Sequence, residues 1–164
     1  MTWRGRVKVP ANNSSARHWP RRRRWTLSEG YVLDTNALLF YAGDQLQKLG
    51  PKAKRAFTAF EQGRGYLVVP APVVLETWLL AQGGRLRFPT TLDAWWADVA
   101  RPELVHEPMS EADVREAARL DWEHRDPFDR LIVATARRLG LPLLTRDSAI
   151  TEWARDTGGI EVAW

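Results

Sequence analysis

The sequence of 164 residues contains no cysteine, so it can form neither disulfides nor thiolate metal sites. It also has no apolar run that approaches the roughly 18 residues needed to span a membrane. The first residues are basic, but no hydrophobic region follows them, so they do not form a secretory signal. The lack of cysteine fits a reducing compartment, and we therefore expect a cytoplasmic protein with no membrane partner.

Acidic residues are absent from the first 28 positions, which hold eight of the 24 basic residues. The other 136 residues carry 16 basic and all 20 acidic residues, so their net charge is −4 although the whole chain is +4. Residues 1–28 also lack apolar periodicity. We predict that they form a disordered arm and that residues 29–164 form one folded domain.

The arm contains a run of four arginines at positions 21–24, between Trp19 and Trp25. Such a run could grip phosphates while the indole rings stack on bases. The alternatives are a dispensable tail or an upstream start-codon assignment. We favour these alternatives because the folded pattern begins so cleanly at Tyr31.

Short apolar strands alternate with helical patterns after the arm. Strands are predicted at 31–33, 65–69, 104–106, 141–144 and 160–163. Helices are predicted after residue 35 and at 51–62, 72–82, 92–100, from 110, at 127–139 and at 148–155. This alternation predicts an α/β fold with a mainly parallel sheet that is covered on both faces. The helix after Ser110 is expected to turn Val114, Ala117, Ala118 and Leu120 inward.

The first strand leads directly into Asp34. Thr35 and Asn36 follow it and can cap the next helix. In an open α/β sheet, a carboxylate at the C-terminal end of a strand points into the crevice where ligands bind. Asp34 could instead be only a cap or turn residue.

Two other acidic residues stand in apolar helices. Glu76 is the only charged residue between Pro70 and Gly84, so it either reaches a rim or is buried with a partner. A polar helix edge that shows one glutamate is the alternative. Asp129 falls in the first turn of the helix that Pro127 opens, in the favourable field of the helix N-terminus.

Two further aspartates stand directly before helices. At Asp126 capping alone would explain the residue type. Asp147 follows a predicted strand and repeats the placement of Asp34, although it too could simply cap a helix. Thr145 offers a hydroxyl at the same edge, and Arg130 could pair with a neighbouring carboxylate or contact phosphate.

A cluster of carboxylates at one sheet edge is unfavourable unless a cation neutralises it. We expect Asp34, Glu76, Asp129 and Asp147 to form such a cluster. Mg²⁺ prefers oxygen ligands, whereas zinc favours cysteine and histidine, and no histidine here has metal-ligand spacing. An acid-only site for Mg²⁺ or Mn²⁺ suits hydrolysis of phosphodiester bonds.

These residues, in this order, resemble the PIN-domain family, specifically the VapC-like toxins of bacterial type II toxin–antitoxin pairs. The resemblance covers about residues 31–164. The matching segments are 32–38, the helix around Glu76, 124–132 with its His-x-Asp-Pro-Phe-Asp-Arg string, and 144–147. The basic arm departs from the family pattern, which normally starts close to the first strand.

The resemblance implies a three-layer α/β/α sandwich and a Mg²⁺- or Mn²⁺-dependent endoribonuclease. It also implies the metal and catalytic residues, which are Asp34, Glu76 and Asp129 with Asp147 as the fourth member. The supporting contacts that it implies are Thr35, Asn36, Thr145, Arg130 and, as a cap, Asp126.

The same resemblance implies a homodimer that acts on RNA. It also implies a cognate antitoxin whose C-terminal segment lies along the acidic groove, with basic side chains paired to the carboxylates. Trp95 and Trp96 could serve one of these surfaces or could belong to the core.

Two other classes of function compete with the nuclease. One is a catalytically silent PIN fold that binds RNA or a protein partner, with the basic arm as the grip. The other is a phosphatase or phosphotransfer receiver with Asp34 as nucleophile. The second is disfavoured because Asn36 stands where a phosphatase would have its second aspartate. Moreover, Arg146 does not replace the lysine of a receiver.

Overall fold

A computed structural model of the chain describes residues 30–43, 45–88, 90–100 and 104–164. The predicted arm at residues 1–28 lies outside these ranges. Among the helices that are described, none is both long and apolar enough to cross a membrane.

A five-stranded sheet with only parallel pairs forms the centre of the domain, in the order β3-β2-β1-β4-β5. The strands are β1 (Gly30–Leu33), β2 (Tyr66–Pro70), β3 (Leu104–Glu107), β4 (Leu143–Leu144) and β5 (Val162–Ala163). The side chains of the three central strands are almost entirely buried because helices cover both faces of the sheet.

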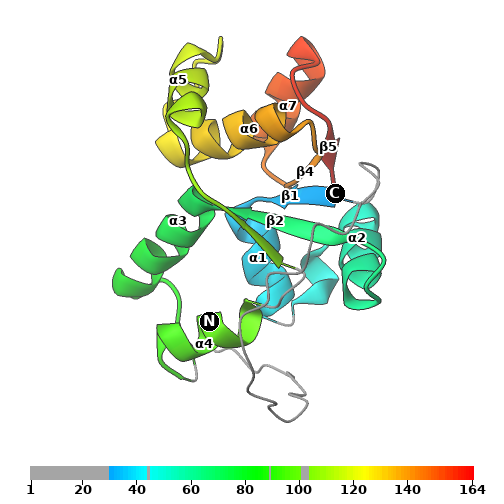
Figure 1. The fold of residues 1–164 in the computed structure, drawn as a ribbon, viewed down its shortest axis with the longest axis vertical. Helices are drawn as coiled ribbons and strands as arrows, with labels where there is room; N and C mark the ends of the chain where they lie inside the picture. The colour runs from blue at the N-terminus through cyan, green and yellow to red at the C-terminus, as the bar shows by residue number, and fades with distance from the viewer. Residues whose placement is uncertain (1–29, 44, 89, 101–103) are drawn as a thin grey trace.

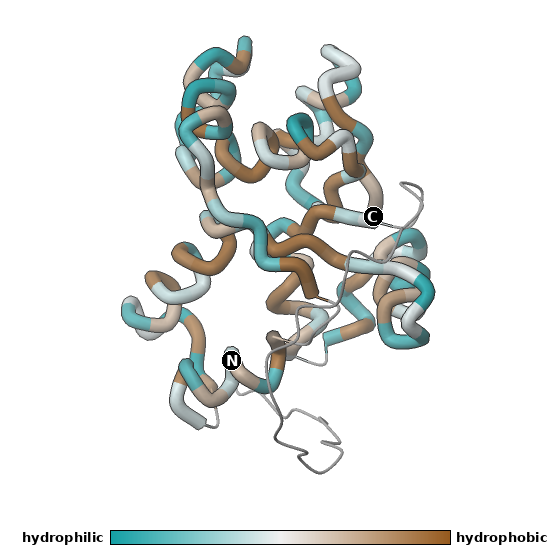
Figure 2. Tube along the Cα trace, viewed as in Figure 1, coloured by the Kyte–Doolittle hydropathy of each residue, from teal (hydrophilic) through white to brown (hydrophobic). Residues whose placement is uncertain are grey.

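The helices form one layer on each face of the sheet (Figure 1). One layer holds α1 (Thr35–Ala42), the 3₁₀ helix η2 (Leu46–Lys48), α2 (Pro51–Glu61), α3 (Ala71–Gln82) and α4 (Leu92–Val99). The other holds α5 (Glu111–Arg119), α6 (Pro127–Leu139) and α7 (Ser148–Thr157). The most hydrophobic segments lie along the strands and on the helix faces turned toward them (Figure 2). The predicted three-layer α/β/α fold is confirmed.

The strand order reverses at β1 and β4. The chain moves outward from β1 to β2 and β3, then returns across the sheet to β4 on the other side of β1. In open α/β sheets a crevice forms at such a switch point, outside the carboxyl ends of the strands. Asp34 follows β1 and Thr145 follows β4, so both lie at this crevice.

Most predicted elements agree with the structure within two residues, but three local expectations are wrong. Thr35 and Asn36 do not cap α1, because the helix begins at Thr35 and Asp34 occupies the N-cap position without a side-chain capping bond. The strand predicted at 141–144 is shorter. Leu141 donates to the Ala136 carbonyl at the end of α6, and Pro142 has no N–H to give to a ladder.

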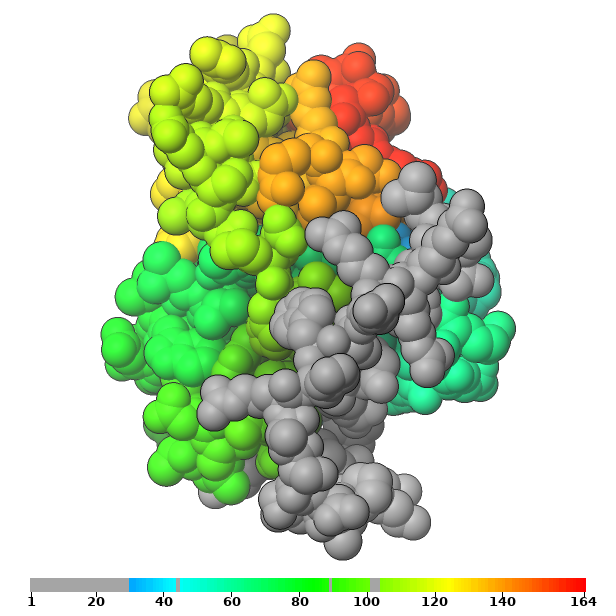
Figure 3. Space-filling model, viewed as in Figure 1, coloured from blue at the N-terminus to red at the C-terminus, as the bar shows by residue number. Residues whose placement is uncertain are grey.

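The inward face of α5 also differs from the prediction. Val114 is 46% exposed and Ala118 is exposed, whereas Asp113 is fully buried. Asp113 completes the capping box with Ser110 and accepts a hydrogen bond of 2.6 Å from Arg138 Nε on α6. This pairing turns Asp113 and the residue one helical turn later, Ala117, toward α6, and the two helices pack side by side (Figure 3).

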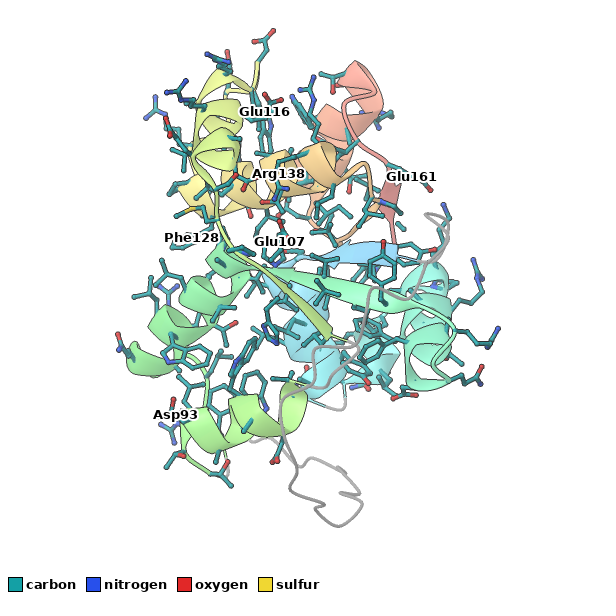
Figure 4. All side chains as sticks on the ribbon, viewed as in Figure 1. Asp93, Glu107, Glu116, Phe128, Arg138 and Glu161 are labelled. Atoms are coloured by element: carbon teal, nitrogen blue, oxygen red, sulfur yellow. The ribbon has the colours of Figure 1, made fainter. Side chains whose placement is uncertain are left out.

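Arg138 also joins this pair to the sheet. Its Nη2 donates to Glu107 Oε1 at the end of β3, at 2.7 Å. Figure 4 shows the Arg138 and Glu107 side chains meeting between α6 and β3. The guanidinium of Arg138 holds the pKa of Asp113 below its usual range, which favours the buried ionised form.

The Arg130 side chain contacts backbone carbonyls and not a carboxylate. Its guanidinium donates to four main-chain carbonyls, one near the end of α5 and three in the segment that joins α5 to α6. They belong to Ala117 (2.9 Å), Leu120 (2.8 Å), Trp122 (2.6 Å) and His124 (3.1 Å). Five rigidly arranged N–H groups make this possible, and a lysine cannot reproduce the pattern. Arg130 therefore fixes the segment that leads into Asp126 and Asp129.

We predict that Arg130→Lys lowers the free energy of unfolding by about 2–3 kcal/mol, because several partly buried carbonyls lose their donors. Urea unfolding followed by far-ultraviolet circular dichroism measures the loss. Arg137→Lys on the same helix is the matched control. Its exposed ion pair with Glu116 predicts a change below about 0.5 kcal/mol. Equal stability of the two variants would contradict the proposed role of Arg130.

Candidate active site

Asp34 is the most deeply buried carboxylate at the switch point, with 3% of the residue exposed. Its Oδ2 accepts a hydrogen bond of 2.7 Å from the Thr145 hydroxyl, which reaches across from the end of β4. The pKa of Asp34 is raised to about 7, mainly by burial and to a smaller extent by the charges of Asp129 and Glu76. The hydrogen bonds from Thr145 and from the Thr35 backbone act in the opposite direction. Asp34 therefore holds a proton more readily than an ordinary aspartate does.

Glu76 faces the same crevice from α3. It is half-buried, and its Oε2 accepts a hydrogen bond of 2.6 Å from the Thr35 hydroxyl. Burial raises the pKa of Glu76, the bond from Thr35 lowers it, and the charges of Asp129 and Asp126 raise it. Of the two sequence interpretations, the structure supports a partly buried glutamate with a partner.

Asp129 lies in the first turn of α6 and has His124 as its partner. Nε2 of His124 is 2.6 Å from Asp129 Oδ2 and donates to the carboxylate. Burial raises the pKa of Asp129, while the hydrogen bond and charge of His124 lower it. The His124 ring is held in turn by stacking on Trp122, with centroids 4.4 Å apart.

His124 is a site residue that the sequence analysis missed. The histidines lack metal-ligand spacing, and no other role was predicted for them. The available signal was the turn at Pro127, which can fold the histidine back onto an aspartate five residues later.

Asp126 and Asp147 both act as helix caps. Asp126 accepts a bond of 2.8 Å from the Phe128 N–H, and Asp147 accepts one of 3.0 Å from the Ile150 N–H. The backbone N–H of Asp147 also donates to Thr145 Oγ1 at 3.0 Å, so Asp147 is linked to Asp34 through Thr145. Their charges reach the site, because Asp126 and Asp147 both raise the pKa of Asp129.

Asp129 is the electrostatic centre of the group. The charge of Asp129 raises the pKa of Asp34 and of Glu76. The charges of Asp126 and Asp147 in turn raise the pKa of Asp129. The structure thus places the other three predicted acidic residues and Asp126 each within electrostatic range of Asp129. They come from the end of β1, the middle of α3, the start of α6 and the start of α7.

The donor set suits a hard divalent cation. Carboxylate oxygens are the ligands that Mg²⁺ and Mn²⁺ accept, and part of the rise in each pKa comes from the other carboxylates, whose repulsion a cation would offset. Across residues 30–164, the described histidines, aspartates and glutamates do not form a ready-made group of three metal ligands. Instead, one carboxylate oxygen each of Asp34, Glu76 and Asp129 accepts a hydrogen bond. The donors are Thr145, Thr35 and His124, respectively.

The remaining predicted supporting residues have different places. Thr35 and Thr145 contact the carboxylates directly, and Arg130 is bound to backbone carbonyls. Asn36 is exposed in the first turn of α1. Trp95 is only 1% exposed, so the possibility that it forms a partner surface is wrong, while Trp96 is partly buried.

The chain belongs to the PIN domain family, because the sequence model of that family matches residues 31–156. Comparison with curated proteins gives no match. The crevice with Asp34, Glu76 and Asp129 lies within the matched range.

Solved structures share the fold. A chain of VapBC2 from Rickettsia felis, solved bound to a DNA fragment from its promoter, matches with a TM-score of 0.56 and 12% identity. The match covers 82% of this chain and 97% of the other. A chain of a toxin–antitoxin complex from Klebsiella pneumoniae matches with a TM-score of 0.53 and 19% identity, covering 82% and 96%.

The raised pKa of Asp34 predicts how stability depends on pH. Between its ordinary pKa of 3.8 and the folded value of about 7, the folded protein binds more protons than the unfolded chain. Without metal, the Asp34 contribution to the free energy of unfolding therefore falls as pH rises through this window. In Asp34→Asn the side chain cannot ionise, but its amide oxygen can still accept the hydrogen bond from Thr145. In EDTA at pH 8 the variant should be more stable than wild type by about 2–4 kcal/mol.

Urea unfolding at pH 4 and pH 8 measures this difference, which should nearly vanish at pH 4. Asp121→Asn is the control, because Asp121 is exposed outside the cluster. A variant at Asp34 that is less stable than wild type at pH 8 would show that the buried carboxylate is not strained.

His124→Ala should raise the pKa of Asp129, because the variant loses the donor that favours the ionised carboxylate. Carbon-detected magnetic resonance of the side-chain carboxyl, followed against pH, measures the change directly. Glu123→Ala serves as the control on the exposed neighbour. An unchanged Asp129 titration would mean that the contact with His124 has no influence on its charge.

Proposed function

We propose that this protein is a metal-dependent endoribonuclease and the toxin of a type II toxin–antitoxin pair, acting in the cytoplasm. The observation that carries the proposal is the meeting of Asp34, Glu76 and Asp129 at the switch point, each with a raised pKa. Membership of the PIN domain family and the shared fold of the two toxin–antitoxin structures support it.

Asp34, Glu76 and Asp129 would hold one or two Mg²⁺ or Mn²⁺ ions, with Asp147 as a fourth acidic group. Such ions, when bound, lower the pKa of a water, orient the phosphodiester and neutralise charge on the leaving oxygen. This donor set contains only oxygen, which agrees with a hard cation and disfavours zinc.

The neighbouring residues orient the carboxylates before RNA arrives. Thr145 holds Asp34, Thr35 holds Glu76 and His124 holds Asp129. Each partner donates its hydrogen bond to the ionised form and so resists protonation in the buried crevice. Arg130 holds the segment that carries His124, which keeps its ring in reach of Asp129.

We also propose a homodimer and a cognate antitoxin. Leu75 and Leu79 on α3 are 52% and 47% exposed, and they border a groove of about 750 Å³ between α3 and the edge strand β3. A second copy would cover this apolar face, which lies on the helix that carries Glu76. Basic side chains of the antitoxin would neutralise the acidic crevice and block it.

Asp34→Asn and Asp129→Asn should each reduce RNA cleavage by at least about 100-fold, because each removes one negative ligand from the site. Cleavage of total RNA by purified protein, with Mg²⁺ or with EDTA, measures the effect. EDTA should stop the wild-type reaction, and added Mn²⁺ should restore it.

Asp121→Asn is the matched control and should cleave like wild type. Circular dichroism of every variant ensures that the comparison is between folded proteins. Undiminished cleavage by folded Asp34→Asn and Asp129→Asn would overturn the assignment. RNA binding without any metal-dependent cleavage by the wild type would favour a silent binding module.

A further inference from the structure

A second cavity, of about 190 Å³, lies between α1, α3 and α4. Pockets for drug-sized ligands are roughly 300–1,000 Å³, so this cavity suits one small ring system. Its lining is mostly apolar and includes three aromatic rings together with three polar side chains. They are Phe40, Phe88 and Trp95, and Asn36, Gln45 and Arg87.

The cavity adjoins the acidic crevice along two helices. On α1, Asn36 directly follows Thr35, whose hydroxyl contacts Glu76, and Phe40 lies one turn further on. On α3, the lining residue Leu80 is one turn beyond Glu76 and shares its helix face. The cavity and the acidic crevice are therefore lined from nearby positions of the same two helices.

Two residues of the lining carry buried polar atoms without partners in the described structure. They are the indole Nε1 of Trp95, which can only donate, and the Oε1 of Gln45, which can only accept. Leaving such groups unsatisfied is costly, so they favour a ligand with both a donor and an acceptor. An apolar side chain from a protein partner would leave both atoms unsatisfied.

Aromatic and cationic groups favour a nucleotide over other small polar ligands. The rings of Phe88 and Trp95 lie 4.5 Å apart, in a tilted pair, and bases bind well against such surfaces. Lys48 Nζ and Arg146 Cζ lie 5.1 Å and 5.2 Å from the Phe40 ring centroid. None of the salt bridges in the described residues involves either cation, so both are available to phosphate.

We propose that this cavity binds one unstacked nucleobase of the RNA, beside the phosphate that is cut, with Trp95 and Gln45 reading its polar edge. Lys48 and Arg146, with Arg87 at the rim, would hold the neighbouring phosphates. This inference rests on the proposed endoribonuclease function and adds the place where the RNA sequence is read.

The indole N–H of Trp95 provides a test that needs no cleavage. The chain has nine tryptophans, and Trp95→Phe identifies the Trp95 signal in a proton–nitrogen correlation spectrum. The four nucleoside monophosphates are added in turn in EDTA, with inorganic phosphate as the control for charge alone. We expect the Trp95 signal to shift with one or two of the nucleotides and not with phosphate.

Two variants test the readout. Trp95→Phe keeps a ring but loses the donor, and Gln45→Leu loses the acceptor at a half-buried loop position where folding is less at risk. Each should weaken binding of the preferred nucleotide by about three- to tenfold. Trp96→Phe, the same substitution at the next position of α4, should leave binding unchanged. In cleavage of a randomised oligoribonucleotide, Gln45→Leu should flatten the base preference beside the cut.

The outcomes separate this inference from the function on which it rests. If the wild type cuts RNA but the Trp95 signal responds to no nucleotide, or responds equally to phosphate, the base pocket is overturned and the nuclease stands. If Trp95 responds to nucleotides but no RNA is cut, the nucleotide site stands and the nuclease assignment is overturned.

Discussion

The structure depends on one unfavourable interaction, the burial of the Asp34 carboxylate next to other negative charges. Burial alone disfavours its ionised form, and Asp129 and Glu76 add like-charge repulsion. A fold selected only for stability would place an apolar residue at this position. The cost is understandable if a cation completes the site, because a bound cation would offset the repulsion between the carboxylates.

The surrounding contacts hold these carboxylates in place at the sheet edge. Thr145 and Thr35 each satisfy one carboxylate from a neighbouring element. Arg130 donates hydrogen bonds to the backbone carbonyls of α5 and of the segment before α6. Arg138 holds α5 against α6 and the edge strand. These two arginines are structural even though they stand close to acidic residues. They stabilise the layer that carries Asp129, which lets the site itself remain strained.

Much of the fold followed from periodicity. Continuous apolar strands between amphipathic helices imply a covered parallel sheet, and the strands and helices were located within about two residues. Two of the errors share one cause, which is that side-chain partners distant in sequence outweigh local preference. Asp113 faces inward on α5 because it accepts a hydrogen bond from Arg138 on α6, and Val114 therefore faces solvent. Likewise, Thr35 binds Glu76, 41 residues away, and does not cap its helix.

The sequence by itself determined which acidic residues stand at strand ends and helix starts, because apolar runs, prolines and capping patterns are local signals. It also placed Asp34, Glu76 and Asp129 in the order of a PIN domain. Only the tertiary structure decided what each side chain touches. The His124 contact to Asp129, the Arg130 clamp and the cavity with the buried Trp95 all need elements brought together across the sheet. Local sequence carries little record of such contacts, since their energies arise from burial and from partners that meet only when the chain has folded.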